Sequence, residues 1–353
     1  ASNNEDEFSL AKTTILSHTV ITDTEHQKAN KQAGELLSPD NILIKRFKLI
    51  NEIYNSEVFA IWRAKDTLIN QIVILKVLTY DGKTKHKQFF ENAFLNEGKI
   101  TFQLIHTNIL KPHSIYKIEH TDSSPIFFNV APYLPNGNLK QLMRRGPLSE
   151  EQITNIFKQI SSALSYLHAN NLVHQDIKAS NILITHDKNY LLSDFTFCNY
   201  VRTNENPGIR ALTYTNTAPE RYNKHVEIIS TESDIFSLGT LIYESAYGKK
   251  LPWKTTKEFL NRNFRLPELP NHFSTGLIKL IHKCLAILPE ERPTAHELVD
   301  YLNNLASMQD EHNPNVLDID SIEDKIDEKT MFIVDGELEE PSNLYHTNLD
   351  KRT

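Results

Sequence analysis

The segment His174–Ile184 reads HQDIKASNILI and decides the fold. It follows residues 149–170, whose apolar residues recur with the period of a helix buried on one face. Within the segment, Asp176 and Asn181 stand five residues apart, so one tight loop can present a carboxylate and an amide oxygen together. Such a carboxylate can accept the proton of an attacking hydroxyl, and such an oxygen can bind Mg²⁺. The spacing is typical of loops that support phosphoryl transfer.

A second carboxylate follows shortly after this segment. Residues 193–196 read SDFT and come directly after the apolar pair Leu191–Leu192. Because hard cations prefer carboxylate oxygens, we expect Asp194 to be the main Mg²⁺ ligand.

The rest of the chain divides by its hydrophobic pattern into a β-rich part and a helical part. Short β-branched and aromatic runs predict strands at residues 47–50, 58–62, 71–78, 109–116 and 126–131. One amphipathic helix is expected among them at residues 87–105. Longer helical patterns follow at residues 149–170, 233–246, 275–286 and 294–306. The first of these opens with a capping box of Ser149 and Gln152.

Further motifs occur in order around the two carboxylates. Residues 218–220 read APE, residues 234–239 match an Asp-x-x-x-x-Gly helix start, and residues 290–293 read EERP. With these motifs, the chain resembles the eukaryotic-type serine/threonine protein kinase family over about residues 45–304. The resemblance implies an α+β, bilobal protein kinase fold, with a small β-rich N-lobe that holds one helix and a larger helical C-lobe. It also implies that Arg292 pairs with Glu220.

The resemblance predicts the domain organisation as well. We expect an N-terminal extension at residues 1–38, a protein kinase domain at 39–306 and an acidic C-terminal tail at 307–353. Within the kinase domain, the N-lobe is expected at about 39–132 and the C-lobe at about 135–306.

Individual residues acquire expected roles from the same resemblance. The expected catalytic residues are Asp176, Lys178 and Asn181, and the expected metal ligands are Asn181 and Asp194. Lys76 is expected to hold the nucleotide phosphates and to pair with Glu97. The apolar side chains expected around the nucleotide are those of Ile61, Ile74, Ala131, Leu134 and Leu183. The expected cofactors are ATP and Mg²⁺, with Mn²⁺ as an alternative. Protein substrates are expected, and Lys178 and Thr213 match the serine/threonine branch.

The glycine-rich phosphate loop of the family is missing. Counting back from the phosphate-binding lysine places Tyr54, Ser56 and Phe59 at the three glycine positions. Because a backbone with side chains approaches phosphates less closely, these side chains are expected to point away or to cover the nucleotide. Ile74 also stands where the family usually has alanine, whereas Ala131 opens space nearby. Two hypotheses therefore remain: an active serine/threonine kinase, or a pseudokinase that acts as a binding scaffold or allosteric activator of a partner.

Two more departures concern control of activity. Gln175 replaces the arginine that clamps a phosphorylated activation segment in many relatives, and a neutral amide cannot form that charge-assisted pair. Thr196 replaces the glycine that follows the metal aspartate and its phenylalanine, which restricts backbone rotation there. We therefore expect activity without phosphorylation of the segment's threonines, which are Thr203, Thr213, Thr215 and Thr217.

Composition excludes several other classes of protein. The chain has 353 residues, of which 39% are hydrophobic and 24% charged, and it has no apolar run of about 18 residues that could span a bilayer. Its net charge is −7, but residues 310–353 alone carry 13 acidic and 4 basic residues. The body is therefore nearly neutral and offers no basic stripe for nucleic acid.

Cysteine usage and the chain ends give expectations about location and partners. Cys198 and Cys284 provide no disulfide framework, so we expect buried thiols in a reducing, intracellular and most simply cytoplasmic setting. The N-terminal residues lack the apolar core of a secretory signal. The N-terminal extension and the apolar island Thr330–Val334 are candidate docking segments for a protein partner, with a disordered tail as the alternative.

Overall fold

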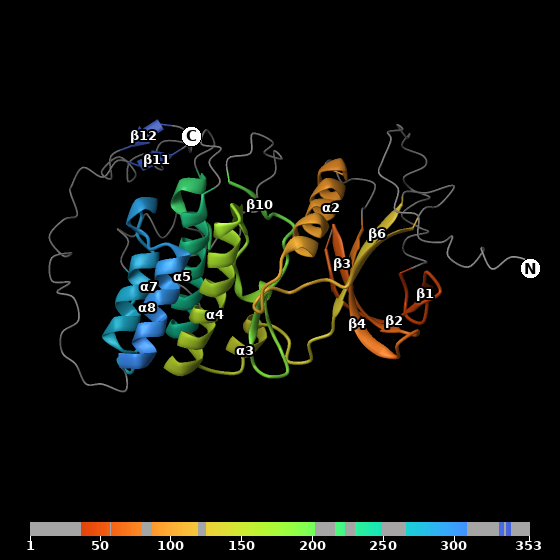
Figure 1. Ribbon diagram of the computed structural model, residues 1–353, viewed down its shortest axis with the longest axis horizontal. Helices are drawn as coiled ribbons and strands as arrows, with labels where there is room; N and C mark the ends of the chain where they lie inside the picture. The colour runs from red at the N-terminus through yellow and green to blue at the C-terminus, as the bar shows by residue number, and fades with distance from the viewer. Residues whose placement is uncertain are drawn as a thin grey trace, which may run out of the picture. The chain divides into compact units, whose positions relative to one another are not determined.

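The computed structural model describes residues 37–56, 58–79, 87–118, 125–201, 216–222, 230–248, 266–308, 332–334 and 337–339. The chain forms two compact units, drawn in Figure 1. The first unit contains the described residues up to 105 and from 110 to 134, and the second contains residues 106–109 and the described residues from 135 onward. A β-rich first unit with one helix and a helical second unit confirm the α+β kinase fold expected from the sequence.

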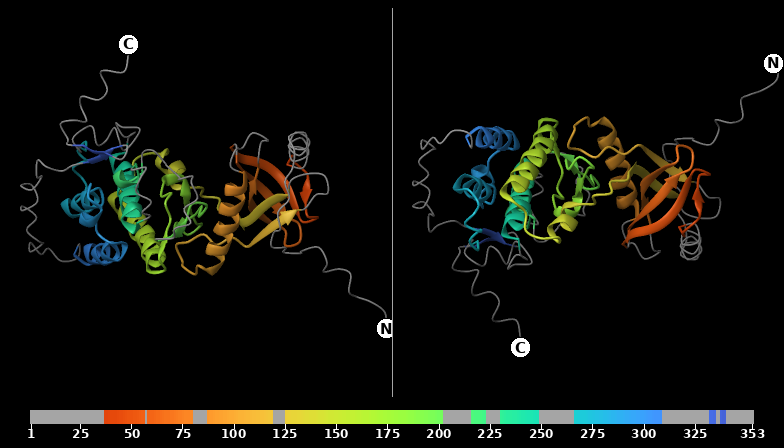
Figure 2. Two further views of the ribbon diagram at one scale, coloured as in Figure 1. Left: turned by 90° about the horizontal axis from the view of Figure 1, so that it is seen from above. Right: turned by 90° about the horizontal axis from the view of Figure 1, so that it is seen from below.

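The first unit is a six-stranded antiparallel sheet in the order β1-β2-β3-β4-β6-β5. Its strands are β1 (Ile42–Leu43), β2 (Phe47–Asn55), β3 (Phe59–Asp66), β4 (Gln71–Leu78), β5 (Ser114–Ile118) and β6 (Ile126–Pro132). The helix α2 (Lys87–Gln103) lies along one face of this sheet in the views of Figures 1 and 2.

The two faces of the sheet carry different side chains because strand residues alternate between faces. Trp62, Leu75 and Phe128 lie on one face and belong to a closed apolar core. The register Phe59↔Leu78 and Leu78↔Phe127 places these residues on the other face. They form a second apolar cluster with Phe94 of α2. The sheet and its helix are therefore joined at the same end of β3, β4 and β6.

The second unit is built around α4 (Glu150–Ala169). This helix packs against α5 (Thr231–Tyr247) and α8 (Ala295–Met308), and α5 packs against α7 (Thr275–Cys284). The remaining elements described here are α3 (Leu139–Met143), β7 (Leu172–Val173), η1 (Ala179–Asn181), β8 (Ile182–Ile184), β9 (Tyr190–Leu192), β10 (Asn199–Tyr200), η2 (Pro219–Tyr222) and η3 (Pro289–Glu291). No helix among the described residues is both long and apolar enough to cross a bilayer.

The limits and the buried face of α4 confirm the sequence prediction. Ser149 is the N-cap, its hydroxyl accepts from Gln152 N at 3.2 Å, and the Gln152 side chain accepts from Ser149 N at 3.0 Å. Along the predicted apolar stripe, Ile153, Phe157, Ile160, Leu164 and Leu167 are all fully buried.

One predicted strand is displaced. The apolar run 109–116 was expected to be a strand, but β5 begins only at Ser114. Pro112 interrupts the run, because proline has no N–H to donate to a sheet ladder. Ile109 instead forms an isolated parallel bridge with Leu192 in the second unit.

The chain ends lie largely outside the described residues. This holds for the N-terminal extension up to residue 36 and for most of the acidic tail. In the tail, part of the apolar island forms β11 (Phe332–Val334), which pairs in antiparallel fashion with β12 (Glu337–Glu339).

Candidate active site

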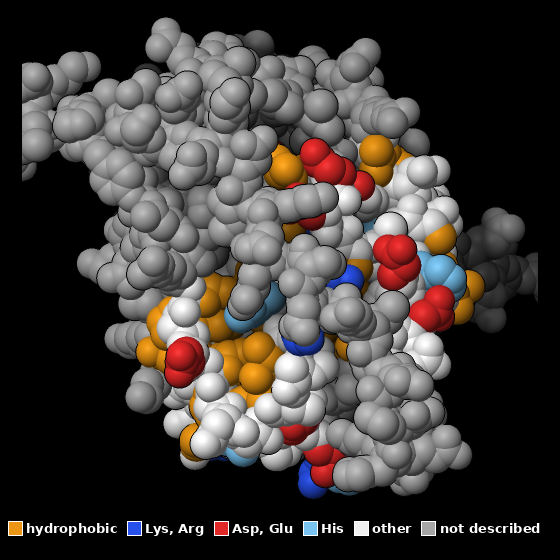
Figure 3. Space-filling view, turned by 90° about the vertical axis from the view of Figure 1, so that its left-hand side faces the viewer, with side chains coloured by type: hydrophobic (Ala, Val, Ile, Leu, Met, Phe, Trp, Pro, Cys, Tyr) orange, Lys and Arg blue, Asp and Glu red, His pale blue; other side chains and the backbone are white. Residues whose placement is uncertain are grey.

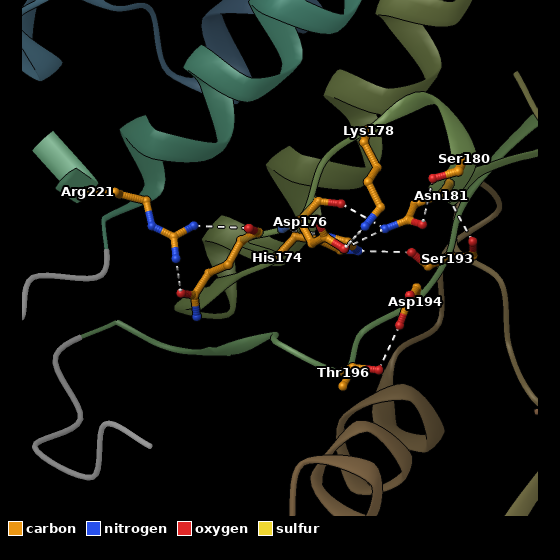
Figure 4. A network of polar contacts seen from close by, with 10 residues as sticks. His174, Asp176, Lys178, Ser180, Asn181, Ser193, Asp194, Thr196 and Arg221 are labelled. Atoms are coloured by element: carbon orange, nitrogen blue, oxygen red, sulfur yellow. Dashed lines mark hydrogen bonds and ion pairs between the residues drawn. The ribbon is translucent and has the colours of Figure 1, made fainter. Parts of the chain in front are cut away.

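The catalytic-loop candidates of the second unit are placed by a short hairpin. β8 pairs with β9 in the register Ile182↔Leu192, so the residues just outside the pair meet at one end. Ser193 accordingly donates from its N to Asn181 O at 2.9 Å and from its hydroxyl to the same oxygen at 2.8 Å. Asp194 is the next residue, so the two expected metal ligands leave the same end of one hairpin, as Figure 4 shows.

Hydrogen bonds join the three expected catalytic residues within this loop. Asp176 is buried, and its Oδ2 lies 2.6 Å from Lys178 Nζ. The Asn181 amide donates from Nδ2 to Asp176 O at 2.9 Å and to Asp176 Oδ2 at 3.0 Å. These hydrogen bonds fix the plane of the Asp176 carboxylate and the orientation of the Asn181 amide.

The orientation of Asn181 leaves an oxygen suited to a cation. Because both hydrogen bonds to Asp176 use Nδ2, Oδ1 points the other way, toward Ser180 Oγ at 3.5 Å. An amide oxygen and the Asp194 carboxylate together suit Mg²⁺, which commonly takes few protein ligands beside waters and substrate phosphates. No group of three His, Cys, Asp or Glu residues that could hold a metal occurs in the described part of the chain. By their chemistry, Asn181 Oδ1 and the Asp194 carboxylate form the candidate metal site.

Asp194 is held in an uncommon backbone conformation. Its φ is +64°, in the left-handed region that aspartate tolerates better than most residues. The buried Thr196 donates from Oγ1 to Asp194 Oδ1 at 2.7 Å. Thr196 therefore contacts the expected metal carboxylate directly, a contact that its position in the sequence did not reveal.

The backbone of the loop is anchored on Asp234, which lies in the first turn of α5 and is fully buried. Its carboxylate accepts from the N–H groups of His174 and Gln175 at 2.8 Å each, and it lies 3.1 Å from His168 Nε2. Burial by itself raises the pKa of Asp234, but the hydrogen bond and charge of His168 and the neighbouring His174 lower it below the ordinary value. The ionised Asp234 carboxylate thus holds the backbone of the loop through these hydrogen bonds.

His174 has a packing role in this loop. Its ring meets the Phe195 ring edge-on at 4.8 Å between centroids, and its Nε2 lies 3.2 Å from Ser193 O. The side chain is fully buried among these neighbours.

Gln175 joins the loop to both ends of the activation segment, which runs from Asp194 to Glu220. Its Nε2 donates to Phe197 O at 2.8 Å. Arg221 of η2 donates from Nη2 to Gln175 Oε1 and from Nη1 to Gln175 O, both at 3.0 Å. Gln175 has a φ of +68°, which turns its side chain and carbonyl toward these partners. Figure 4 shows these two hydrogen bonds as dashed lines from the Arg221 guanidinium.

The first unit holds the other expected charged pair. Lys76 of β4 lies 2.8 Å from Glu97 Oε2 of α2, and the two side chains are only 12% and 8% exposed. The apolar residues expected around the nucleotide partly share the face of Lys76, because the register pairs Ile61↔Lys76 and Ile74↔Ala131. Leu134 is half-buried at the end of this unit, and Leu183 belongs to β8 of the second unit.

Arg292 and Glu220 form the pair that the EERP and APE motifs indicated. The guanidinium donates to both Glu220 oxygens, from Nη1 at 2.7 Å and from Nη2 at 2.8 Å.

The profile of the family described as "protein kinase domain" matches residues 55–302. The chain belongs to the serine/threonine protein kinase family. Kinases of this family take a phosphoryl group from ATP with a divalent metal ion and act on proteins.

Proteins that are named as protein kinases are similar to this chain, in agreement with its family. A protein of Acanthamoeba polyphaga mimivirus named as a serine/threonine-protein kinase is 30% identical over 284 residues, which are 76% of this chain and 98% of the viral protein. A protein of Clostridium acetobutylicum with the same type of name is 27% identical over 304 residues, 78% of this chain but 44% of the relative. Mitogen-activated protein kinase kinase kinase 9 of Arabidopsis thaliana is 33% identical over 212 residues, 58% of this chain and 26% of the relative. The kinase therefore spans less than half of the two cellular relatives.

In this kinase the β2–β3 hairpin stands where the family has its glycine-rich loop. The described part of this hairpin needs no glycine. Ser56 closes the turn, since its hydroxyl accepts from Phe59 N and donates to Phe59 O, both at 3.0 Å. None of the described residues from 54 to 59 has a positive φ. Tyr54 is 59% exposed and stands opposite Ile61, which shares the face of Lys76. Phe59 packs against α2, on the face of the sheet that also carries Lys76.

Two other features of the kinase lie apart from the candidate site. Cys198 and Cys284 are both buried, as expected, and burial raises the pKa of the Cys284 thiol.

A cavity of about 1330 Å³ lies among α4, α5, α7, η3 and α8, and none of the expected catalytic residues lines it. Figure 3 looks onto the side of the second unit that α7 and α8 form, where hydrophobic side chains are exposed between charged ones. Lys279 and Lys283 face Glu290 and Glu291 around this cavity, so its charge is mixed.

Proposed function

We propose that this kinase transfers the γ-phosphoryl group of ATP to serine and threonine hydroxyls of proteins, with Mg²⁺ as the metal ion. The observation that carries the proposal is the interlocked loop in which Asp176 contacts Lys178 at 2.6 Å and Asn181 at 3.0 Å. Phosphoryl transfer depends mainly on positioning and electrostatic stabilisation, and this loop supplies both.

The proposed step balances in a simple way. The substrate hydroxyl oxygen attacks the γ-phosphorus, the bond from that phosphorus to the β–γ bridging oxygen breaks, and ADP leaves. The hydroxyl proton passes to the Asp176 carboxylate, which Asn181 holds in a fixed plane. Lys178 places a positive charge beside the Asp176 carboxylate. There it offsets the negative charge that develops as the substrate hydroxyl oxygen attacks the γ-phosphorus.

Asn181 and Asp194 are the proposed metal ligands. Bound Mg²⁺ would offset the negative charge of the phosphates. Both donors are oxygens that leave the same end of the β8–β9 hairpin, a set that suits Mg²⁺ and Mn²⁺ alike. Lys76 is the proposed phosphate ligand, and the proposed adenine contacts are Ile61, Ile74, Ala131, Leu134 and Leu183.

The alternative of a pseudokinase gains no support from the comparisons. Its motive was the side chains at the loop-glycine positions together with Ile74. Of these, Ser56 closes the hairpin turn and Tyr54 is 59% exposed. The charged groups needed for transfer are all present in the sequence.

The test is transfer of radiolabelled γ-phosphate to a generic basic protein, with the full chain and saturating Mg·ATP. Asp176→Asn keeps the shape of the side chain but removes the proton acceptor, so the rate is expected to fall at least a hundredfold. Asp187→Asn, at a carboxylate that is 84% exposed, is the matched control and should act like the wild type. Equal incorporation by the wild type and Asp176→Asn would refute the proposal. Repeating the assay with Mn²⁺ identifies the preferred metal.

We also propose that the kinase is active without phosphorylation of its activation segment. The support is a set of hydrogen bonds that involve no phosphate: Gln175 donates to Phe197 O, near the start of the segment, and the Arg221 guanidinium donates to Gln175. A phosphate is not needed to join these elements. Of the segment's four threonines, Thr217 is buried, and Thr203, Thr213 and Thr215 lie outside the described residues.

The corresponding test compares initial rates before and after phosphatase treatment. We expect the rates to be equal, and Gln175→Ala to lower both about tenfold, because it loses the hydrogen bond to Phe197 O and the charge-assisted hydrogen bond from Arg221 Nη2. A treated enzyme that recovers its rate only after a lag with ATP would show that a phosphate is required.

A further inference from the structure

The packing of Phe59 points to a role for this side chain beyond the hairpin turn. Phe59 begins β3 and stands opposite Leu78, next to the tip of the hairpin. Its ring meets Phe90 of α2 edge-on at 6.3 Å and lies nearly parallel to Phe94 at 6.4 Å between centroids. The hairpin is thus attached to α2 through one aromatic side chain.

The same ring also lies beneath the phosphate-binding candidate. Lys76 Nζ is 4.7 Å from the centroid of the Phe59 ring, within the range of a cation–π interaction. Lys76 also binds Glu97 at 2.8 Å, so the ammonium is held between a carboxylate of α2 and a ring of β3. Because both charged side chains are largely buried, the ring face replaces part of the water that the ammonium loses.

We propose that Phe59 is a positioning residue that holds Lys76 against Glu97 and fixes α2 to the sheet. The proposal rests on the proposed function in one respect, since it takes Lys76 to be the residue that holds the ATP phosphates. A glycine in place of Phe59 would have no ring to offer either Lys76 or the two α2 phenylalanines. The absent loop glycine is thereby replaced by a side chain with a function of its own.

The first test reads the position of Lys76 without nucleotide or activity. The full chain is treated briefly with an amine-acetylating reagent, and acetylation of Lys76 is measured by peptide mass spectrometry relative to the exposed Lys45. Phe59→Leu keeps an apolar side chain but removes the ring, so Lys76 should be acetylated at least threefold faster. Phe59→Tyr keeps the ring and should match the wild type within the error. Tyr54→Leu, at an exposed aromatic residue of the same hairpin, should leave the Lys76 rate unchanged.

A variant that preserves shape guards against a folding defect in Phe59→Leu. Trifluorophenylalanine at position 59 has nearly the same packing volume but a weaker negative ring face, because fluorine withdraws electron density. It should raise the acetylation rate of Lys76 above that of the wild type. Wild-type acetylation in both Phe59→Leu and the fluorinated protein would overturn the proposal, as would a Phe59→Tyr protein that is acetylated as fast as Phe59→Leu.

The second test measures kcat and KM for Mg·ATP in the same proteins. Removal of the ring in Phe59→Leu is expected to lower kcat about threefold to thirtyfold. The change in KM should be smaller, because the misplaced Lys76 ammonium still attracts the phosphates. Restoration of kcat by Phe59→Tyr supports the positioning role. If the wild type transfers no phosphate but Lys76 acetylation responds to Phe59 as expected, the proposed function fails and this inference stands. If the wild type is active and Phe59→Leu has its full kcat, the inference fails alone.

Discussion

Thr196 donates its hydroxyl hydrogen bond to Asp194 Oδ1 at 2.7 Å. The acceptor is the carboxylate proposed to bind Mg²⁺, and its residue has a φ of +64°. A hydrogen bond from a buried hydroxyl to a charged oxygen is among the stronger ones in proteins. Thr196 therefore fixes the direction in which Asp194 presents its oxygens.

Loss of this hydroxyl should weaken metal binding more than it weakens the fold. Thr196→Val keeps the shape of the side chain, and we expect the Mg²⁺ concentration for half-maximal rate to rise about tenfold at saturating ATP. Initial rates against Mg²⁺ concentration measure this. Thr196→Ser retains the hydroxyl and should stay within about twofold of the wild type. An unchanged Mg²⁺ dependence in Thr196→Val would mean that Asp194 does not need this contact.

Arg292 should contribute much of the stability of the second unit. Its side chain is fully buried, and its five N–H groups donate to Glu220 Oε1 and Oε2 and to the carbonyl oxygens of Glu232, Ala286 and Ile287. Lysine has three donors and no planar fork, so Arg292→Lys leaves some of these oxygens without a partner. We expect the free energy of unfolding to fall by about 2–4 kcal/mol, measured by urea denaturation.

The matched control for this prediction is Arg144→Lys, at an exposed arginine of the same unit. It should change the free energy of unfolding by less than about 0.5 kcal/mol. If Arg292→Lys is as mild as the control, the hydrogen bonds of Arg292 are dispensable and its buried position has another cause.

Two N-cap serines provide an internal comparison of helix capping. Ser149 accepts from Gln152 N at the start of α4, whereas Ser230 at the start of α5 makes no side-chain capping hydrogen bond. Ser149→Ala should therefore lower the free energy of unfolding by about 1 kcal/mol, and Ser230→Ala by clearly less. Thermal or urea unfolding of the two variants checks the order. A larger loss in Ser230→Ala would contradict the assignment of the caps.

The features that the sequence predicted well depend on neighbours along the chain. The start of α4 follows from Ser149 and Gln152, which cap the helix within three residues of each other, and the buried stripe follows from its period. The order of the motifs around Asp176 indicated Asn181 and Asp194 as metal ligands, but the β8–β9 hairpin that places both residues at one end was not among the predicted strands.

The features that the sequence did not predict depend on contacts between distant segments. The sequence left open whether Phe59 points away from the nucleotide or covers it, because the direction of its ring depends on Phe90 and Phe94, which lie more than thirty residues further on. Arg221 lies 46 residues from Gln175, and no local pattern indicates that its guanidinium takes the amide oxygen. The start of β5 was missed for a local reason, since Pro112 lies within the predicted strand.

The ion pair of Arg46 and Asp66 in the first unit should make stability depend on pH in a defined range. Hydrogen bonds from Arg46 outweigh burial and hold the pKa of Asp66 below its ordinary value. A lowered pKa contributes stability above the pKa of the unfolded state, about 3.9, and this contribution is lost as pH falls through the lower folded value. Asp66→Asn removes it, so the variant should be roughly 1–2 kcal/mol less stable than the wild type at pH 7, a modest figure because Arg46 is 34% exposed. Urea denaturation of both proteins between pH 7 and pH 3 should show the difference shrinking below about pH 4. A difference that stays constant over this range would mean that Asp66 is not the titrating group.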